Sequence, residues 1–199
     1  ESKDWNEEWE KNYFKPIRIG NDCIIRASFH EPEPGYTYTI IIDPKMAFGT
    51  GHHFTTSLIV RRLLGTDLQG KRVIDMGTGT GILAILALKL GASSATGIEI
   101  DRMAYENAME NGKLNDSMAC FIHGDASALD GLAPADLFIA NINRNILLAD
   151  MALYAAALKR GGTMLLSGFY SRDVPMLAEE AAKLDLSVQN AESDNDWKL

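Results

Sequence analysis

Hydrophobic positions follow a regular alternation over residues 71–184. Short apolar runs typical of buried strands occupy 72–76, 95–100, 119–123, 135–140 and 162–167. Between them lie stretches with helical patterning, at 81–90, 102–114, about 144–158 and 173–184. Strands that alternate with helices indicate parallel strands joined by helical crossovers. The pattern therefore predicts an α/β fold built on a doubly wound parallel sheet.

The first part of the chain follows a different pattern. Aromatic residues at helical spacing predict a helix over 4–14, whose aromatic stripe packs on the body of the protein or on a neighbour. Further along we expect a hairpin at 17–26, a strand at 38–42 and a helix at 57–64. We therefore expect 1–42 to form a linker helix and a strand region that packs on the core, and 43–199 to form the ligand-binding domain.

The turn between the first strand of the α/β region and its helix carries the most specific chemistry. Gly77, Gly79 and Gly81 alternate there, just after Asp75. Such glycines let a ligand lie against bare backbone at a helix N-terminus, where free N–H groups point outward. A dinucleotide fingerprint would need glycine where Ile82 stands, and no P-loop string occurs in the chain. The spacing therefore excludes both nucleotide motifs.

The acid beside the turn indicates which ligand remains. A carboxylate at Asp75 is poorly placed for a pyrophosphate but suits a ligand with an ammonium and a sulfonium group, as in S-adenosylmethionine. The alternative is a structural strand-to-helix turn. Glu99 ends the next expected strand, 22 residues after Gly77, which is close to the separation at which such an acid meets ribose hydroxyls. Together the two motifs favour a nucleoside-cofactor site.

Composition and charge narrow the class of protein. The 199 residues, 46% of them hydrophobic, suffice for one globular domain with a full core. No apolar run reaches the roughly 18 residues that a membrane span needs. A net charge of −8 argues against direct nucleic-acid binding and favours a basic partner. Cys23 and Cys120 stand in apolar runs, so we expect buried thiols in a reducing, cytoplasmic setting. The four histidines form no metal-binding pattern, and no metal is expected.

A second glycine loop gives the chain a specific resemblance. Residues 43–56 read D-P-K-M-A-F-G-T-G-H-H-F-T-T, and they are followed by V-I-D-M-G-T-G-T-G-I-L-A-I and by G-I-E-I-D. With these motifs the chain resembles the ribosomal protein L-eleven methyltransferase family over nearly all of residues 4–199. Asp125 after Gly124, the Ala140-Asn141-Ile142 step and the run from Gly161 to Gly168 continue the match.

The resemblance implies a fold and a reaction. The fold is a mostly parallel, seven-stranded class I methyltransferase (Rossmann-like) sheet, whose last strand begins near Trp197 and is expected to be cut short. The cofactor is S-adenosylmethionine, and the reaction is N-methylation of lysine and N-terminal amines of a basic protein of the large ribosomal subunit. The family also carries an N-terminal recognition domain, which we do not expect within this chain.

The resemblance also assigns site residues. By motif match, the expected cofactor contacts are Thr56, Gly77, Glu99 and Asn141, with Phe48, Gly79 and Asp125 beside them. Two departures concern the acceptor side: His52-His53-Phe54 stands where the family reads T-H-P, and Asn143-Arg144 replaces a more apolar stretch.

Two of these residues have structural alternatives. The side-chain carbonyl of Asn141 is able to accept a hydrogen bond from an acceptor amine, so we expect it to be the catalytic residue. Asn141 is alternatively a cap for the helix that follows Asn143. Thr55 or Thr56 is likewise a candidate cap for the helix expected at 57–64.

Two other functions stay open at this point. One is a methyltransferase that acts on a small molecule or a nucleic-acid base, although Asn141 is not followed by the N-P-P-[YF] string of base methylation. The other is a cofactor-binding module that is inactive without a recognition domain.

Overall fold

The computed structural model describes residues 14–43, 53–194 and 197–199. Its centre is a parallel sheet of five strands in the order β6-β5-β4-β7-β8. The strands are β4 (Arg72–Met76), β5 (Ser94–Glu99), β6 (Cys120–His123), β7 (Ala135–Asn141) and β8 (Leu158–Ser167). The expected α/β, doubly wound class is confirmed, since each expected strand from 72 to 167 is found and all pairs in this sheet are parallel.

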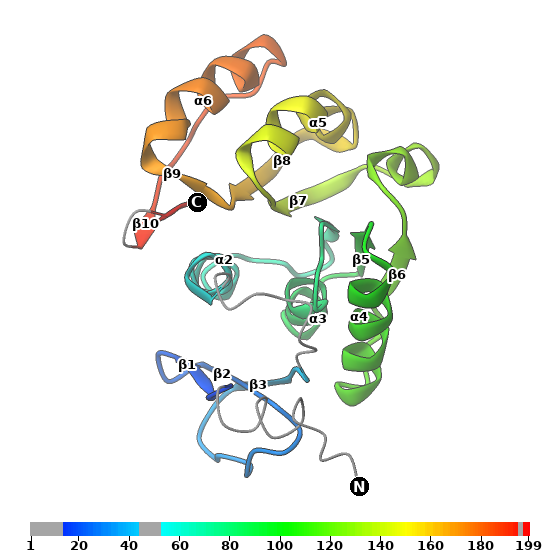
Figure 1. Ribbon diagram of the computed structural model, residues 1–199, viewed down its shortest axis with the longest axis vertical. Coiled ribbons are helices and arrows are strands. Elements are labelled where there is room, and N and C mark those ends of the chain that lie inside the picture. Colours follow the sequence, from blue (N-terminus) through cyan, green and yellow to red (C-terminus); the bar gives the residue numbers. More distant parts are fainter. Residues whose placement is uncertain (1–13, 44–52, 195–196) are drawn as a thin grey trace, which may run out of the picture.

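The two faces of the sheet enter two separate hydrophobic clusters. Along β4, Val73 enters one cluster, while Ile74 and Met76 enter the other. Successive side chains of a strand point to opposite faces, so a continuous apolar run serves a sheet that is covered on both sides. The covering helices are α2 (His53–Leu64), α3 (Ile82–Lys89) and α4 (Arg102–Leu114) on one side, and α5 (Arg144–Ala156) and α6 (Val174–Lys183) on the other (Figure 1).

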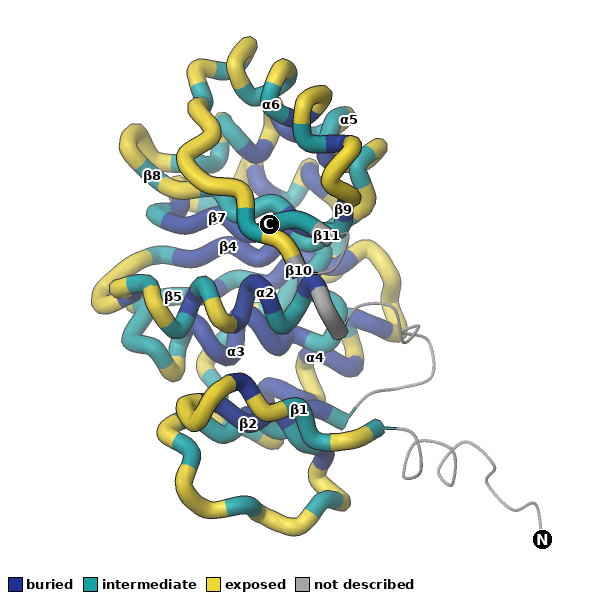
Figure 2. The backbone as a smooth tube through the Cα atoms, turned by 90° about the vertical axis from the view of Figure 1, so that its left-hand side faces the viewer, coloured by how far each residue is buried: buried dark blue, intermediate teal, exposed yellow. Residues whose placement is uncertain are grey.

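Helix α3 is apolar on all sides because it is covered on all sides. Residues 82–87 are all buried, and the helix shares a cluster with the main sheet and with a second, smaller sheet. That sheet consists of β1 (Ile17–Ile19), β2 (Cys23–Arg26) and β3 (Tyr38–Ile41), with β1 and β2 antiparallel and β2 and β3 parallel. The expected hairpin at 17–26 is thus confirmed. In Figure 2 the buried segments run through the middle layers between the exposed outer ones.

The carboxyl-terminal strands lie outside the main sheet. β9 (Phe169–Tyr170), β10 (Ser193–Asp194) and β11 (Trp197–Lys198) form an antiparallel sheet in the order β10-β11-β9. The main sheet therefore has five strands in the described residues, and not the seven that we expected. Gly168, with φ of 92°, separates β8 from β9 and turns the chain. The strand at Trp197 then pairs with β9 rather than lengthening the central sheet.

Several local predictions need correction. Cys120 is exposed because β6 is an edge strand, whereas Cys23 is buried as expected. Helix α2 begins at His53 rather than at residue 57, and β8 begins at Leu158, where we expected helix.

The helix expected at 4–14 lies outside the described residues. Short 3₁₀ turns cover Ala126–Gly131 and Ser171–Asp173. Among the described residues, the structure has no helix that is long and apolar enough to cross a membrane.

Candidate functional site

The expected site residues gather where the strand order of the main sheet reverses. β4 lies between β5, the next strand in the chain, and β7, the third strand after β4. Open α/β sheets bind their ligands outside the carboxyl ends of the strands at such a switch point. Met76 pairs with Ile98 and Ala140, so Gly77, Glu99 and Asn141 follow at the same level of the sheet. We call this the carboxyl edge.

The glycine turn adopts the backbone that its sequence requires. Gly77, Gly79 and Gly81 have φ of 69°, 56° and 81°, in the left-handed region that side chains rarely enter. At Gly77 a Cβ would lie 2.8 Å from the side chain of Ile142, so that position has no room for one. At Gly79 the space around the missing Cβ is open to 4 Å. The turn thus leaves its backbone bare at Gly79, as a close-lying ligand requires.

Asp75 lies beneath this turn. Its side chain is 1% exposed, and Oδ2 accepts a hydrogen bond of 2.6 Å from Thr78 Oγ1. The other oxygen, Oδ1, is buried and has no hydrogen-bond partner among the described residues. Burial raises the pKa of Asp75 from 3.8 to about 7, an effect that the Thr78 hydroxyl opposes and nearby Glu99 reinforces. Asp75 therefore offers a buried acceptor that no described residue satisfies.

Glu99 links the glycine turn to the end of β5. Its Oε2 accepts from the Gly79 N–H at 2.9 Å, and its Oε1 accepts from the Asp101 N–H at 3.0 Å. The residue is 9% exposed. A carboxylate has about four acceptor positions, so both oxygens can accept further hydrogen bonds. Glu99 is held in place by backbone groups and is able to receive two ligand hydroxyls.

Asn141 ends β7, next to the turn. Its Oδ1 is buried and makes no hydrogen bond to the described residues. The capping alternative fails for Asn141, because Asn143 is the N-cap of α5. The Oδ1 of Asn143 accepts from the N–H groups of Asn145 and Ile146, at 3.1 and 3.2 Å. Within the part of the chain that the structure describes, Asn141 is thus left with an unused acceptor.

The remaining candidate residues divide into three cases. Thr56 is partly buried as the fourth residue of α2, and Thr55 is the third, so neither is the cap residue that we considered. Asp125 is exposed after β6, where its Oδ1 accepts from the N–H and the hydroxyl of Ser127, and these bonds lower the pKa of the carboxyl. The Gly124 N–H donates to Glu99 O, which places Asp125 at the carboxyl edge. Phe48 lies outside the described residues.

A buried amide pair on α4 supports the turn and was missed in the sequence. Asn111 Nδ2 donates to Thr80 O at 2.9 Å, and Asn111 Oδ1 accepts from the Asp43 N–H at 3.0 Å. Asn107 Nδ2 donates to Asp43 O at 2.8 Å. Both asparagines are fully buried and join the start of the second glycine loop to the first. Asparagines four residues apart on the buried face of a helix were the available signal.

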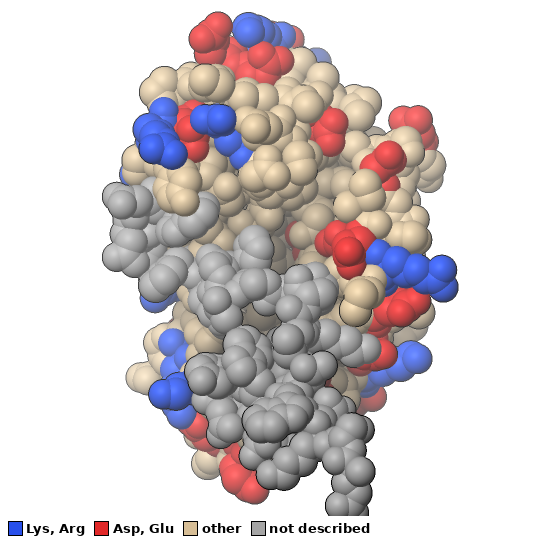
Figure 3. Space-filling model, in the orientation of Figure 1, with Lys and Arg blue, Asp and Glu red and all other residues tan. Residues whose placement is uncertain are grey.

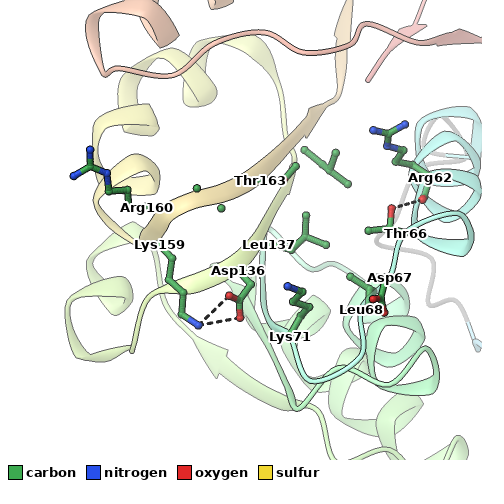
Figure 4. Close-up of a pocket in the computed structure, with 13 residues that line it drawn as sticks. Arg62, Thr66, Asp67, Leu68, Lys71, Asp136, Leu137, Lys159, Arg160 and Thr163 are labelled. Carbon is green, nitrogen blue, oxygen red and sulfur yellow. Dashed lines mark hydrogen bonds and ion pairs between the residues drawn. The ribbon is translucent and has the colours of Figure 1, made fainter.

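A cavity at the opposite, amino edge of the sheet has a different character. Its volume is about 230 Å³, and Lys71, Asp136 and Lys159 are among its lining residues (Figure 4). Lys159 Nζ lies 2.9 and 3.0 Å from the two oxygens of Asp136, which also accepts from the Arg72 N–H at 2.8 Å. The carboxylate here is satisfied by protein groups, so we do not assign the ligand site to this cavity.

The observed set of acceptor oxygens fits S-adenosylmethionine. The Asp75 oxygen that no described residue bonds suits a positive charge, and the two oxygens of Glu99 suit ribose hydroxyls. The open side of Gly79 admits close approach of a ligand. Among the described residues there is no group of three or more side chains that could hold a metal ion.

Comparisons with known proteins agree with this assignment. The family model described as "Ribosomal protein L11 methyltransferase (PrmA)" matches residues 1–199. A relative from Porphyromonas gingivalis named ribosomal protein L11 methyltransferase is 56% identical over 97% of this chain and 67% of its own length. The chain is also similar to the crystal structure of a ribosomal protein L11 methylase from Lactobacillus delbrueckii subsp. bulgaricus. The TM-score is 0.85 and the identity 26%, over 94% of this chain and 95% of that one.

A more distant structure is similar in fold alone. The magnesium protoporphyrin IX methyltransferase of Synechocystis, solved with bound SAM, has a TM-score of 0.58 and 18% identity, over 72% of this chain and 74% of that one.

Proposed function

Because the chain belongs to the ribosomal protein L11 methyltransferase family, an S-adenosylmethionine-dependent class of enzymes, we propose that it methylates lysine and N-terminal amines of ribosomal protein L11. The observation that carries the proposal is the buried Oδ1 of Asn141 at the end of β7, to which no described residue donates a hydrogen bond. An amine that attacks a methyl group needs an acceptor for its hydrogen, and Asn141 provides one beside the glycine turn.

The demands of the reaction fall mainly on positioning. Bound S-adenosylmethionine supplies a methyl group on a sulfonium, which is already a good leaving group, so the protein has to align the reactants. Glu99 and the bare backbone at Gly79 would hold the nucleoside end, and Asp75 would face the positive end. Thr56, Asp125 and Phe48 remain proposed neighbours of the cofactor.

The acceptor amine must lose its proton before it attacks. For a lysine with an ordinary pKa near 10.4 this costs about 4.6 kcal/mol at pH 7, and for an α-amine near 7.8 it costs about 1 kcal/mol. The Asn141 carbonyl accepts from a neutral amine as well as from a charged one, and a site that excludes water favours the neutral form. No described residue donates a hydrogen bond to Asn141 Oδ1, so this oxygen is available to the amine.

The surface charge supports a basic protein partner. The chain has a net charge of −8, and on the face drawn in Figure 3 the basic side chains of the described residues lie in separate groups, without a continuous basic surface. We propose that the enzyme acts in the cytoplasm on a basic ribosomal protein, without binding nucleic acid directly. We also propose residues 43–199 as the methyltransferase domain, against which the strands of 1–42 pack through a shared cluster.

Methyl transfer to free ribosomal protein L11, mapped by mass spectrometry, tests the proposal. We expect S-adenosylmethionine-dependent mass increases on lysine and α-amino nitrogens. Asn141→Ala should reduce the rate by about 100-fold, the range of one positioned catalytic group, with a smaller effect on S-adenosylhomocysteine affinity. The matched control Asn190→Ala truncates an exposed asparagine and should change neither. Transfer only to a small molecule or to RNA, or cofactor binding without transfer to any acceptor, would contradict the proposed function.

A further inference from the structure

The segment from Asn141 to Arg144 is held from several sides. The Ile142 N–H donates to Ser167 O at 3.0 Å, which extends the pairing of β7 with β8 by one residue. The side chain of Ile142 fills the space beside Gly77. On the other side, a Cβ at Gly168 would lie 2.6 Å from Ile142 O. The segment therefore has close contacts with both the glycine turn and the β8–β9 bend.

Arg144 adds an ionic contact to this segment. It is the first residue of α5, and its Nη1 lies 2.8 Å from Asp173 Oδ1. Its Nε and Nη2 donate to Asn145 Oδ1 at 3.1 and 3.0 Å. The guanidinium thus makes bonds on two sides in a fixed planar arrangement, which a lysine ammonium does not reproduce.

Asp173 is a buried carboxylate that also holds the bend after β8. It is 5% exposed, and its second oxygen accepts from the Tyr170 N–H at 3.0 Å. The Tyr170 N–H and the guanidinium of Arg144 lower the pKa of Asp173, which keeps the carboxyl ionised. One side chain thereby joins the start of α5 to the end of β9.

These contacts involve the segment that directly follows Asn141, to which we assign the acceptor amine. Ile146, on the first turn of α5, and Tyr170, the last residue of β9, are 41% and 40% exposed. Asp173 connects the two elements that carry these side chains, α5 and β9. Asn141 lies three residues before the start of α5. A change at the ion pair is expected to act first on the acceptor side, where its hydrogen bonds to Asn145 and Tyr170 lie. Glu99 at the nucleoside end is held separately, by the N–H groups of Gly79 and Asp101.

We propose that Arg144 and Asp173 are positioning residues for the acceptor side of the methyl transfer. Through Asn143 and Ile142 the pair holds Asn141 Oδ1 at the end of β7, and through the Tyr170 N–H it holds the end of β9. This inference rests on the proposed function, because it concerns the acceptor of that reaction. It does not concern cofactor affinity, which belongs to the turn at residues 77–81 and to Glu99.

The test compares Arg144→Met and Arg144→Lys with the parent protein at saturating S-adenosylmethionine and free L11. We expect kcat for Arg144→Met to fall at least tenfold, with the S-adenosylhomocysteine dissociation constant unchanged within twofold. Arg144→Lys retains the charge opposite Asp173 and should recover part of kcat. It also keeps the test valid if Arg144→Met does not fold.

The matched control is Lys159→Met, which breaks an ion pair of similar length at the amino edge, 2.9 Å from Asp136. It should leave kcat unchanged. If the Arg144–Asp173 pair has only a structural role, Arg144→Met and Lys159→Met will both lower the melting temperature and both leave kcat intact. That outcome overturns the inference. If the parent protein transfers no methyl group to L11 while it binds the cofactor, the proposed function fails and this inference fails with it.

Discussion

The two edges of the central sheet are built from the same strands but differ in how their polar groups are satisfied. At the amino edge, Asp136 has a lysine and a backbone N–H as partners. At the carboxyl edge, Asp75 and Asn141 each keep a buried oxygen that no described residue bonds. Buried polar atoms are nearly always paired in proteins, so two neighbouring acceptors that no described residue bonds are candidates for contact with a ligand.

The sharpest test of this contrast is the pH dependence of stability. The unfolded chain releases the Asp75 proton near pH 3.8, whereas the folded protein retains it to about pH 7. The contribution of Asp75 to stability is therefore full below pH 4 and is lost as pH rises to 7. Asp75→Asn should remove this decline, by up to about 4 kcal/mol at 1.4 kcal/mol per unit. Urea unfolding from pH 4 to 8 measures it.

Asp136 at the amino edge should show the opposite sign. Its pKa is lowered by the Arg72 N–H and by Lys159, so its contribution is present above the ordinary pKa and lost as pH falls. The parent protein should therefore gain stability from Asp136 as the pH rises from acidic values, and Asp136→Asn should reduce this gain. Identical pH profiles for the two variants would remove the contrast between the edges.

Glycine positions offer the next largest effect. Gly79 and Gly70 both have positive φ, 56° and 69°, and at both the space that an added Cβ would occupy is open to 4 Å. Either alanine should cost about 1–2 kcal/mol of stability through backbone strain. Gly79→Ala should also weaken S-adenosylhomocysteine binding by about 100-fold, because the methyl group occupies the bare side of the turn and displaces backbone hydrogen bonds. Calorimetric titration in which both variants bind alike would contradict the assignment of the turn.

Glu99→Gln should have a smaller effect on the same measurement. It preserves shape but loses the charge that strengthens hydrogen bonds to hydroxyls, so affinity should fall by roughly tenfold. Asp136→Asn is the carboxylate control at the other edge and should leave affinity unchanged. A Glu99→Gln dissociation constant equal to that of the parent would exclude Glu99 from the cofactor site.

The smallest expected effect is at Thr56. Thr56→Val keeps the β-branched shape and deletes one hydroxyl, so cofactor affinity should fall by about three- to tenfold, the worth of one neutral hydrogen bond. Since Thr56 lies inside α2 and does not cap it, the melting temperature should change little. A lower melting temperature with unchanged affinity would show that the hydroxyl serves the helix alone.

Much of the fold was predictable because its signals are local. The alternation of apolar runs predicted every strand of the central sheet, since the inner strands are buried on both faces and need continuous hydrophobicity. The positive φ of Gly77, Gly79 and Gly81 is a conformation that glycine itself allows. By contrast, the exposure of Cys120 depends on the position of β6 at the edge of the central sheet. The separate sheet of β9, β10 and β11 likewise depends on which strands pair with one another. That choice is made by pairing between distant segments.

The candidate site shows the same division. The sequence alone determined the family, the glycine turn and the acids and amide that follow the strands, because those features are set by residue type and spacing. Only the tertiary structure decided which oxygens of the described residues lack partners. In the structure, Asn143 rather than Asn141 caps α5, and Asp75 is buried. Asp173 pairs with Arg144 although 29 positions separate them in the chain. Desolvation and pairing are properties of the packed chain, and no local pattern encodes them.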